Sequence, residues 1–491
     1  MPKSRIHATP WIPLTRGAWA RPVAREGRSL LRLAAPIMLI ALVNMGMSIT
    51  DTAMVSALFG AEALASVAVG SDLYSILFYL GAGVLGGLAP FYTAAVVQAD
   101  TRERIRLERI GLAAVVLIGA LLAPLLWSAP DWLAFLGLEP GLLQQGRGYT
   151  RAMALTLLPM LGVVLYRTIL TAAEQPEVFL KVTLAMLPLN AALNAVLMLG
   201  AGPVPALGPA GAGVSSLLVA STSLAILVGI ARSGRRPGGA GSVGARVDRR
   251  GLAAVLRVGL PIGIATVAEV GIFLGATIYA ATLGAAEVAA HTLTLRTAGV
   301  AYAVPAALLQ AAMVRMARAQ SLGDAALQRA VTASSLLLSL LFGVGICAAL
   351  VLAARPLARS FFDDSEAGVA AAGIAAGLLV LLGVLEFLVG PGSAAAGLLR
   401  GRKDTRMPML CTLVGQWAVG APVAFGLCEL AGLGITGVWI GLGAGSLLTT
   451  VLMLGRLYAL QGRAFARHAG HGTNEPFAGD SGSVAKALAT R

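Results

Sequence analysis

Twelve apolar runs, each about 20 residues long, alternate with short polar segments along the chain, and a run of this length can cross a bilayer as an α-helix. Windows of about 19 residues place six helices near 33–56, 64–92, 108–128, 150–172, 178–199 and 210–231. Six more fall near 253–280, 287–313, 328–353, 368–397, 407–428 and 435–458. The pattern predicts an all-α polytopic membrane protein with twelve transmembrane helices.

The composition supports this prediction. Of the 491 residues, 57% are hydrophobic and only 12% are charged, and the mean hydropathy is +0.82. A soluble domain has about a quarter charged residues, so that class is excluded. The net charge of +14 would suit nucleic acid, but the basic residues fall in alternate loops, so we predict no nucleic-acid partner. The three cysteines lie in apolar runs without ligand spacing, so the sequence indicates neither a disulfide framework nor a metal site.

The loop charges predict the domain boundaries and the orientation. We expect a cytoplasmic N-terminal segment, a first six-helix bundle, a cytoplasmic linker, a second six-helix bundle and a disordered cytoplasmic tail, at 1–30, 31–231, 232–252, 253–458 and 459–491. Lys and Arg concentrate in the two termini, the linker and the second, eighth and tenth loops. The positive-inside rule then places both termini in the cytoplasm, with the chain in the inner (plasma) membrane. The ninth loop, with Arg355, Arg359, Asp363, Asp364 and Glu366, is mixed and weakens this pattern.

The two halves of the chain resemble each other. LRLAAPI at 31–37 matches LRVGLPI at 256–262, and ALFGAEALAS at 57–66 matches ATLGAAEVAA at 281–290. The offset changes only from 225 (256 against 31) to 224 (281 against 57). Chance similarity between Ala- and Gly-rich helices is the alternative. Six helices per half make the repeat parallel, which predicts two pseudo-symmetric bundles around a central cavity.

Two acidic residues lie within predicted membrane helices, Asp51 and Glu269, one in the opening helix of each half. A charge at the bilayer centre costs roughly 2.5–3.5 kcal/mol, so we expect both to bind and release a coupling ion. Asn190 and Asn194 are four residues apart, share one helix face and can hydrogen-bond Asp51. The structural alternatives are helix–helix glue for Asp51 and an ion pair with Arg296 for Glu269.

Further candidates lie in the second half and among the aromatic residues. Glu386 lies beside the triplet Gly390-Pro391-Gly392, which is expected to bend or break its helix, and we assign Glu386 to the coupling-ion group. The alternatives are that Glu386 pairs with Arg296 or faces a cytoplasmic vestibule. Candidate residues for lining a substrate cavity, with ordinary packing as the alternative for the aromatic ones, are Tyr74, Phe78, Tyr279, Arg296 and Tyr302.

Several of these residues stand in segments typical of one family. These segments are Pro36, DTAMV from Asp51, Gly60 to Ser66, LNAALN with the two asparagines, GLPIGIATVAEVGIF with Glu269, and LGAAEVAAH ending in His291. Together they resemble the multidrug and toxic compound extrusion (MATE) family, in its bacterial NorM-like branch, from about residue 30 to 460. The resemblance implies two six-helix bundles and cation-coupled export of organic compounds. His291 is either a structural hydrogen-bonding group or a proton carrier.

The chain also departs from the pattern of that branch. The tenth-helix acid of NorM-like members corresponds to a position near Val389, and the nearest acid in this chain is Glu386. Thr292 stands where the family has glutamine, and Arg296 stands where a neutral polar residue is expected. The displaced acid favours H+ over Na+ as the coupling ion, although the choice stays open.

The sequence as a whole predicts a secondary active antiporter. It would export organic, cationic or amphipathic compounds in exchange for H+ or Na+ by alternating access. The chain contains no GxxxxGK[ST], HExxH, GxSxG or CxxC, so we predict neither an ATP-driven pump nor an enzyme, and no cofactor beyond the coupling ion. The alternative is a flippase for lipid-linked precursors or an exporter of anionic metabolites from the same superfamily. The expected partners are a small organic substrate and membrane lipids, with the protein as a monomer.

Overall fold

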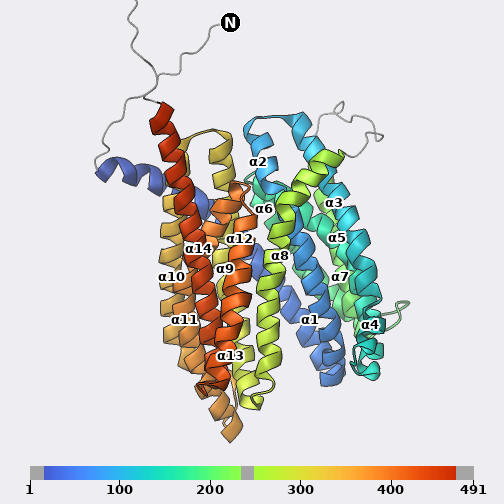
Figure 1. The fold of residues 1–491 in the computed structure, drawn as a ribbon. Coiled ribbons are helices and arrows are strands. Elements are labelled where there is room, and N and C mark those ends of the chain that lie inside the picture. The colour runs from blue at the N-terminus through green and yellow to red at the C-terminus, as the bar shows by residue number, and fades with distance from the viewer. Residues whose placement is uncertain (1–15, 234–247, 472–491) are drawn as a thin grey trace, which may run out of the picture.

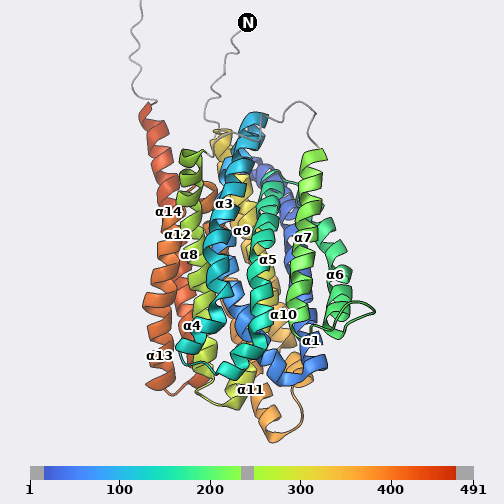
Figure 2. The same ribbon diagram turned by 90° about the vertical axis from the view of Figure 1, so that its right-hand side faces the viewer.

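A computed structural model describes residues 16–233 and 248–471, which form long helices (Figure 1, Figure 2). Twelve helical segments in these ranges are long and apolar enough to cross a membrane, which confirms the predicted number of spans and the all-α class. The helices of the first half are α1 (Arg16–Gly86), α2 (Ala89–Val97), α3 (Thr101–Trp127), α4 (Ala129–Phe135), α5 (Pro140–Ala172), α6 (Pro176–Leu199) and α7 (Ala210–Ser233).

The second half repeats this organisation. Its helices are α8 (Arg249–Ala280), α9 (Ala285–Ser321), α10 (Ala325–Phe361), α11 (Glu366–Gly401), α12 (Arg406–Thr412), α13 (Ala421–Glu429) and α14 (Gly434–His471). A π-helical segment, Leu413–Gly420, joins α12 to α13. The two halves form two bundles that stand side by side in Figure 1, and each has its own apolar core.

One glycine in each half reverses the chain between the first two spans. In α1, Gly60 has φ 82° and separates a first span (Arg21–Gly60) from a second span (Glu62–Val97). Gly284, with φ 148°, lies between α8 and α9. The two glycines are equivalent in the repeat, and positive φ is readily accessible only to glycine. The loop match seen in the sequence therefore has a backbone cause.

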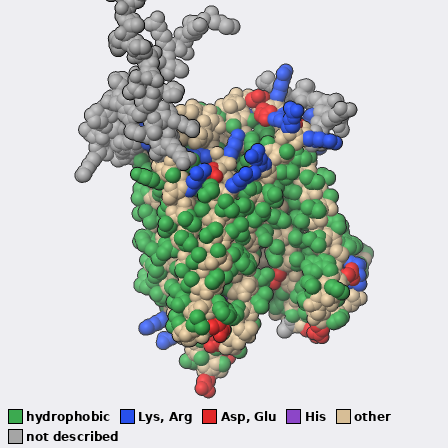
Figure 3. Space-filling model, in the orientation of Figure 1, with side chains coloured by type: hydrophobic (Ala, Val, Ile, Leu, Met, Phe, Trp, Pro, Cys, Tyr) green, Lys and Arg blue, Asp and Glu red, His purple; other side chains and the backbone are tan. Residues whose placement is uncertain are grey.

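The bundles are closest at the end where α1 begins and α14 ends, called the termini end below. There Gly83 and Gly87 of the second span face Gly263 and Gly259 of α8, and a Cβ atom on either Gly83 or Gly87 would come within 2.5 Å of the facing backbone. At the opposite end, the far end, the surface between the bundles is hollowed (Figure 3). The structure is thus closed at the termini end and open at the far end.

Charged side chains also join the bundles at the termini end. The Arg315 guanidinium of α9 donates to the Glu26 carboxylate of α1 at 2.7 Å, and to the Glu174 carboxylate between α5 and α6 at 2.9 Å. The start of the first span packs on α9 through Leu30, Leu33 and neighbouring apolar residues. The first span therefore contacts the second-half bundle before it reaches its own.

Three helices extend beyond the predicted membrane spans into the flanking segments. Helix α1 begins at Arg16 within the segment 1–30, α8 begins at Arg249 within the linker 232–252, and α14 continues to His471 within the tail 459–491. These flanks are rich in Ala, Leu and Arg, and each added residue of a formed helix gains a hydrogen bond. The disorder predicted for 459–491 is therefore wrong up to His471, and the rest of the tail lies outside the described residues.

The triplet around Pro391 does not break its helix. Helix α11 is assigned without interruption from Glu366 to Gly401. Neighbouring helices pack closely around this part of α11, since a Cβ on Gly392 would touch Thr450 and one on Gly397 would touch Leu309. Tertiary packing thus maintains a helix that the local sequence alone would weaken.

Candidate functional site

The first-half bundle holds Asp51 against the two asparagines of α6. Asn194 Nδ2 donates to Asp51 Oδ1 at 2.5 Å, and Asn190 lies close enough to interact with the same carboxylate. Both asparagines are buried, with 3% and 0% of their surface exposed. Ser215 of α7 donates to the Asn190 backbone carbonyl and fixes α6 to its neighbour. The four-residue spacing predicted this shared face, and the structure brings it to Asp51.

This group has unused hydrogen-bonding capacity. The Oδ1 atoms of Asn190 and Asn194 are buried and have no hydrogen-bond partner among the described residues. A protonated Asp51 would present an O–H donor to such an acceptor. A sodium ion would be coordinated by both the carboxylate and the amide oxygens. Tyr149 of α5, also buried, lies close enough to interact electrostatically with Asp51 and Asp72. The site is therefore able to change its protonation or its ion content without losing its amide partners.

A second group forms between α8, α9 and α11. The Glu269 carboxylate lies close enough to Arg400 and to the Tyr302 hydroxyl to interact electrostatically with both. Glu386 is 9% exposed and lies close enough to Glu269 for the two carboxylates to repel each other. Binding a proton or a cation between Glu269 and Glu386 would relieve this repulsion.

The two groups lie at different depths. By the repeat offset of 225, the position equivalent to Asp51 is Ala276, seven residues beyond Glu269. Seven residues are two helical turns, so Glu269 lies on the same helix face but about 10 Å nearer the termini end. The two acids are therefore not symmetry-related copies of one site.

Arg296 interacts with an acidic residue of the other bundle. Its electrostatic partner is Asp72 of the second span, and it forms no ion pair with Glu269 or Glu386 in the described part of the chain. Asp72 and Arg296 belong to different bundles, so this attraction acts across the interface between them. The alternatives that paired Arg296 with Glu269 or with Glu386 are therefore wrong.

The candidate cavity aromatics separate into different places. Tyr74 and Phe78 stack on the second span, with ring centroids 5.7 Å apart. Tyr302 belongs to the Glu269 group. Tyr279 lies at the end of α8, where its hydroxyl donates to Glu429 and its ring contacts Phe425. The structure does not bring Tyr279 together with the other three.

His291 is a structural residue in this fold. Its side chain is 0% exposed, its Nδ1 accepts from Trp439 Nε1 at 3.1 Å, and its Nε2 lies 3.0 Å from Thr277 Oγ1. Both ring nitrogens are engaged within the second-half bundle. The geometry matches the structural alternative, in which the imidazole joins α8, α9 and α14.

Sequence reasoning missed two charged residues of the site, Asp72 and Arg400. Asp72 lies inside an apolar run as Asp51 does, so the same criterion would have found it. Arg400 stands at the end of α11 and was counted only as a loop charge, yet its side chain lies near Glu269 and Tyr302. No group of three or more His, Cys, Asp or Glu that could hold a metal ion occurs in the described ranges.

Comparison with known proteins places the chain in a family. The family model MatE matches residues 36–196 and 261–425, one match in each bundle. The chain belongs to the MatE family, the multidrug and toxic compound extrusion (MATE) transporters. Members of this family are membrane transporters and not enzymes, in agreement with the prediction from the sequence.

Full-length relatives support this assignment. The probable multidrug resistance protein NorM of Agrobacterium fabrum is 30% identical over 91% of this chain and 96% of its own. The multidrug resistance protein NorM of Burkholderia vietnamiensis is 33% identical, with the same coverage of each chain. A solved outward-facing multidrug resistance MATE transporter of the MOP superfamily has a TM-score of 0.78 at 18% identity, covers 92% of this chain and is itself fully covered. The chain thus has the MATE fold and resembles NorM proteins over most of its length.

Proposed function

We propose that this MATE transporter exports organic compounds, cationic or amphipathic, in exchange for H+ or Na+ by alternating access. The observation that carries the proposal is the pair of buried amide oxygens beside Asp51, which have no hydrogen-bond partner in the described residues. Such oxygens are costly to bury unsatisfied, and protonation or cation binding at Asp51 would satisfy them. Asp51 is therefore the coupling-ion residue, with Asn190 and Asn194 as its partners.

The second group, around Glu269, would bind the substrate or a second ion. Glu269 and Glu386 give the second-half bundle an acidic pair that would attract a cationic substrate or take up a second ion. Loading of either site changes the charge in the hollow between the bundles and so favours one conformation over the other. The displaced position of Glu386 favours H+ as the ion.

The arrangement of the bundles is consistent with an outward-open state. Lys and Arg side chains gather near the termini end in Figure 3, which the positive-inside rule assigns to the cytoplasm. The hollow then opens to the outside, where substrate would leave and the coupling ion would enter. We place both termini in the cytoplasm, the protein in the inner membrane, and the transporter as a monomer.

The test is transport in proteoliposomes under a pH gradient alone and under a Na+ gradient alone, with a fluorescent organic cation. One of the two gradients should drive transport of the cation by the wild type, and the Asp51→Asn variant should lose that transport. Glu108→Gln is the matched control, because Glu108 is also a buried carboxylate of the first-half bundle, where it accepts a hydrogen bond from Tyr166 at 3.0 Å. Equal transport by Asp51→Asn and wild type would contradict the proposal.

A second candidate substrate class has its own observation. Arg400 brings positive charge to the Glu269 group, and its Nε is buried with no hydrogen-bond partner in the described structure. An anionic metabolite would supply acceptors to this arginine. Transport of an anionic dye, with none of the cation, would favour that alternative over export of cations.

A further inference from the structure

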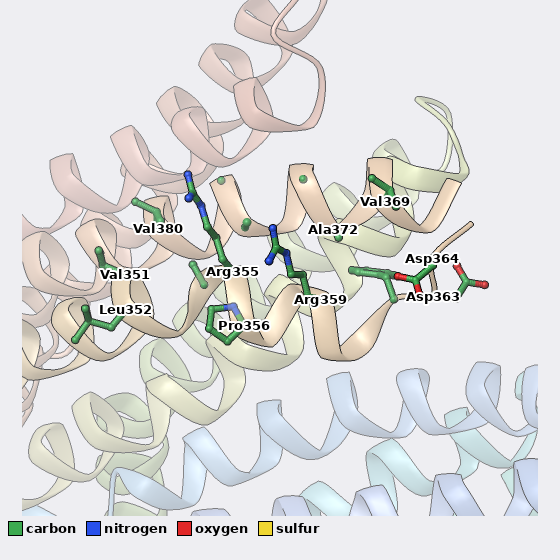
Figure 4. Close-up of a pocket in the computed structure, with 15 residues that line it drawn as sticks. Val351, Leu352, Arg355, Pro356, Arg359, Asp363, Asp364, Val369, Ala372 and Val380 are labelled. Atoms are coloured by element: carbon green, nitrogen blue, oxygen red, sulfur yellow. The ribbon is translucent and has the colours of Figure 1, made fainter. Parts of the chain in front are cut away.

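A groove lies between α10 and α11, near the loop that joins them at the far end of the second-half bundle (Figure 4). Its volume is about 900 Å³, and it extends along the two helices from the loop between them to Val351 and Val380. Its walls come from α10, α11 and the loop between them, and no residue of the Asp51 or Glu269 group lines it.

The chemistry of the walls changes in a fixed order along the groove. The inner part is apolar, with Val351, Leu352 and Val380; the arginines Arg355 and Arg359 follow; and Asp363 and Asp364 stand at the mouth (Figure 4). Arg359 and Val351 are eight residues apart on α10, which is about 12 Å of helix. The order is apolar, then positive, then negative, from the membrane interior outwards.

The floor of the groove is open because two glycines line it. Gly373 and Gly377 are four residues apart on one face of α11, and a Cβ atom on either would meet no other atom within 4 Å. Larger side chains would therefore fit there without disturbing the protein. The open floor leaves a slot as long as several methylene groups.

The arginines lack partners within the protein. Arg355 and Arg359 are exposed, and neither forms an ion pair in the described ranges. Both lie in the last two turns of α10, Ala325–Phe361, just past the apolar run 328–353 that the sequence predicts as the membrane span. A guanidinium at this edge of the hydrocarbon core can reach a lipid phosphate. These are also two of the charges that weaken the positive-inside pattern.

We propose that the groove binds one phospholipid whose headgroup carries both a phosphate and a primary ammonium group, that is, a phosphatidylethanolamine. The phosphate lies between Arg355 and Arg359, whose guanidinium groups donate to phosphate oxygens. The ammonium group donates to the carboxylates of Asp363 and Asp364. One acyl chain lies in the slot over Gly373 and Gly377.

The charges at the mouth select this headgroup. A phosphatidylglycerol offers the same phosphate but places only neutral hydroxyls beside two carboxylates. A phosphatidylcholine has a positive group but no N–H to donate. Asp363 also accepts a hydrogen bond from Ser365 at 2.6 Å, which fixes its carboxylate at the mouth. Free phosphate would contact only the two arginines and would leave the apolar slot empty, so it fits the groove less well than a phospholipid.

Native mass spectrometry of the full-length protein measures this binding directly. The detergent-purified protein is delipidated and given phosphatidylethanolamine, phosphatidylglycerol or phosphatidylcholine of identical acyl chains, and the bound fraction is compared. We expect the wild type to retain one phosphatidylethanolamine in preference to the other two. Arg355→Gln/Arg359→Gln should lower its bound fraction by roughly fivefold or more, since each exposed charge pair contributes modestly. Gly377→Phe should do the same by filling the slot.

The matched control is Arg147→Gln/Arg151→Gln. These arginines have the same four-residue spacing near the far end of α5, but Arg147 pairs with Asp131 and Arg151 lies over the Trp127 ring. Lipid retention should be unchanged in this variant. A loss equal to that of the groove variant would overturn the proposal, because it would reflect total charge and not the groove.

Exchanging the mouth charges tests the headgroup itself. Asp363→Asn/Asp364→Asn should keep lipid binding but shift the preference from phosphatidylethanolamine towards phosphatidylglycerol. Soluble glycerophosphoethanolamine should not compete at equal concentration, because it lacks the acyl chain. Unchanged preference in the aspartate variant, competition by the soluble headgroup, or equal retention in the wild type and the arginine variant would each overturn the proposal.

Discussion

Replacing Arg315 with glutamine should strongly destabilise the protein, because it leaves a buried carboxylate without a partner. The guanidinium donates to both oxygens of Glu26, at 2.7 and 2.8 Å, and to Glu174 at 2.9 Å. Only 10% of the Arg315 and Glu26 side chains is exposed, against 32% for Glu174. The Glu26 contact is therefore the dominant part of the network.

The expected magnitude follows from these exposures. Removing one partner of a buried ion pair costs about 3–5 kcal/mol. The more exposed Glu174 contact adds at most about 1 kcal/mol. Arg318→Gln is the matched control, because Arg318 lies one turn further on, is 40% exposed and is 3.7 Å from the same Glu174. Its loss should cost less than about 1 kcal/mol.

The assay is unfolding in detergent micelles, followed by intrinsic tryptophan fluorescence, for Arg315→Gln, Arg318→Gln and Glu26→Gln/Arg315→Gln. The double variant removes the stranded carboxylate, so it should be more stable than Arg315→Gln alone. A destabilisation by Arg315→Gln no larger than that by Arg318→Gln would refute the reasoning. So would a double variant less stable than the single one.

Two further variants test other contacts at the termini end. Gly87→Ala should reduce transport and thermal stability, because its Cβ would meet the Gly259 backbone at 2.5 Å. Gly86→Ala is the control: its Cβ would meet nothing within 4 Å, so this variant should resemble the wild type in the same assays. Asp248 caps α8, and hydrogen bonds from the Gly251 backbone N–H and from the Arg106 guanidinium hold the pKa of this carboxyl below its usual value. Because its folded-state pKa is lower than the unfolded value of about 3.9, its contribution is complete above about pH 4 and is lost as the pH falls through the folded-state pKa. Asp248→Ala should therefore lower the melting temperature at neutral pH, and the difference from the wild type should disappear in acid; a difference that persists there would contradict this assignment.

Much of the fold could be predicted from apolar length and internal repetition. All twelve spans were found because each exceeds the thickness of the hydrocarbon core. The helix ends could not be predicted, since hydropathy marks where lipid ends and not where the backbone leaves the helix. Helix α14 therefore continues to His471, well past its last apolar window.

The candidate site was predictable where spacing decides the geometry. Asn190 and Asn194 share a face because four residues make about one turn, and Asp51 lies against that face. Contacts made by long side chains across the interface could not be predicted in this way. Arg400 contacts the Glu269 group from the end of its helix, and Arg296 faces Asp72 of the other bundle. Neither direction is encoded in the spacing along one helix.

The glycine contact between the second span and α8 has a mechanical consequence. Gly83, Gly87, Gly259 and Gly263 place bare backbone against bare backbone, with no side chain from these positions inserted between the helices. Such a surface holds through many weak Cα–H···O and dispersion contacts, none of which locks a particular rotamer. In the alternating access proposed above, the bundles would part there as two smooth faces, and a methyl group added to either face would meet the facing helix when they close again.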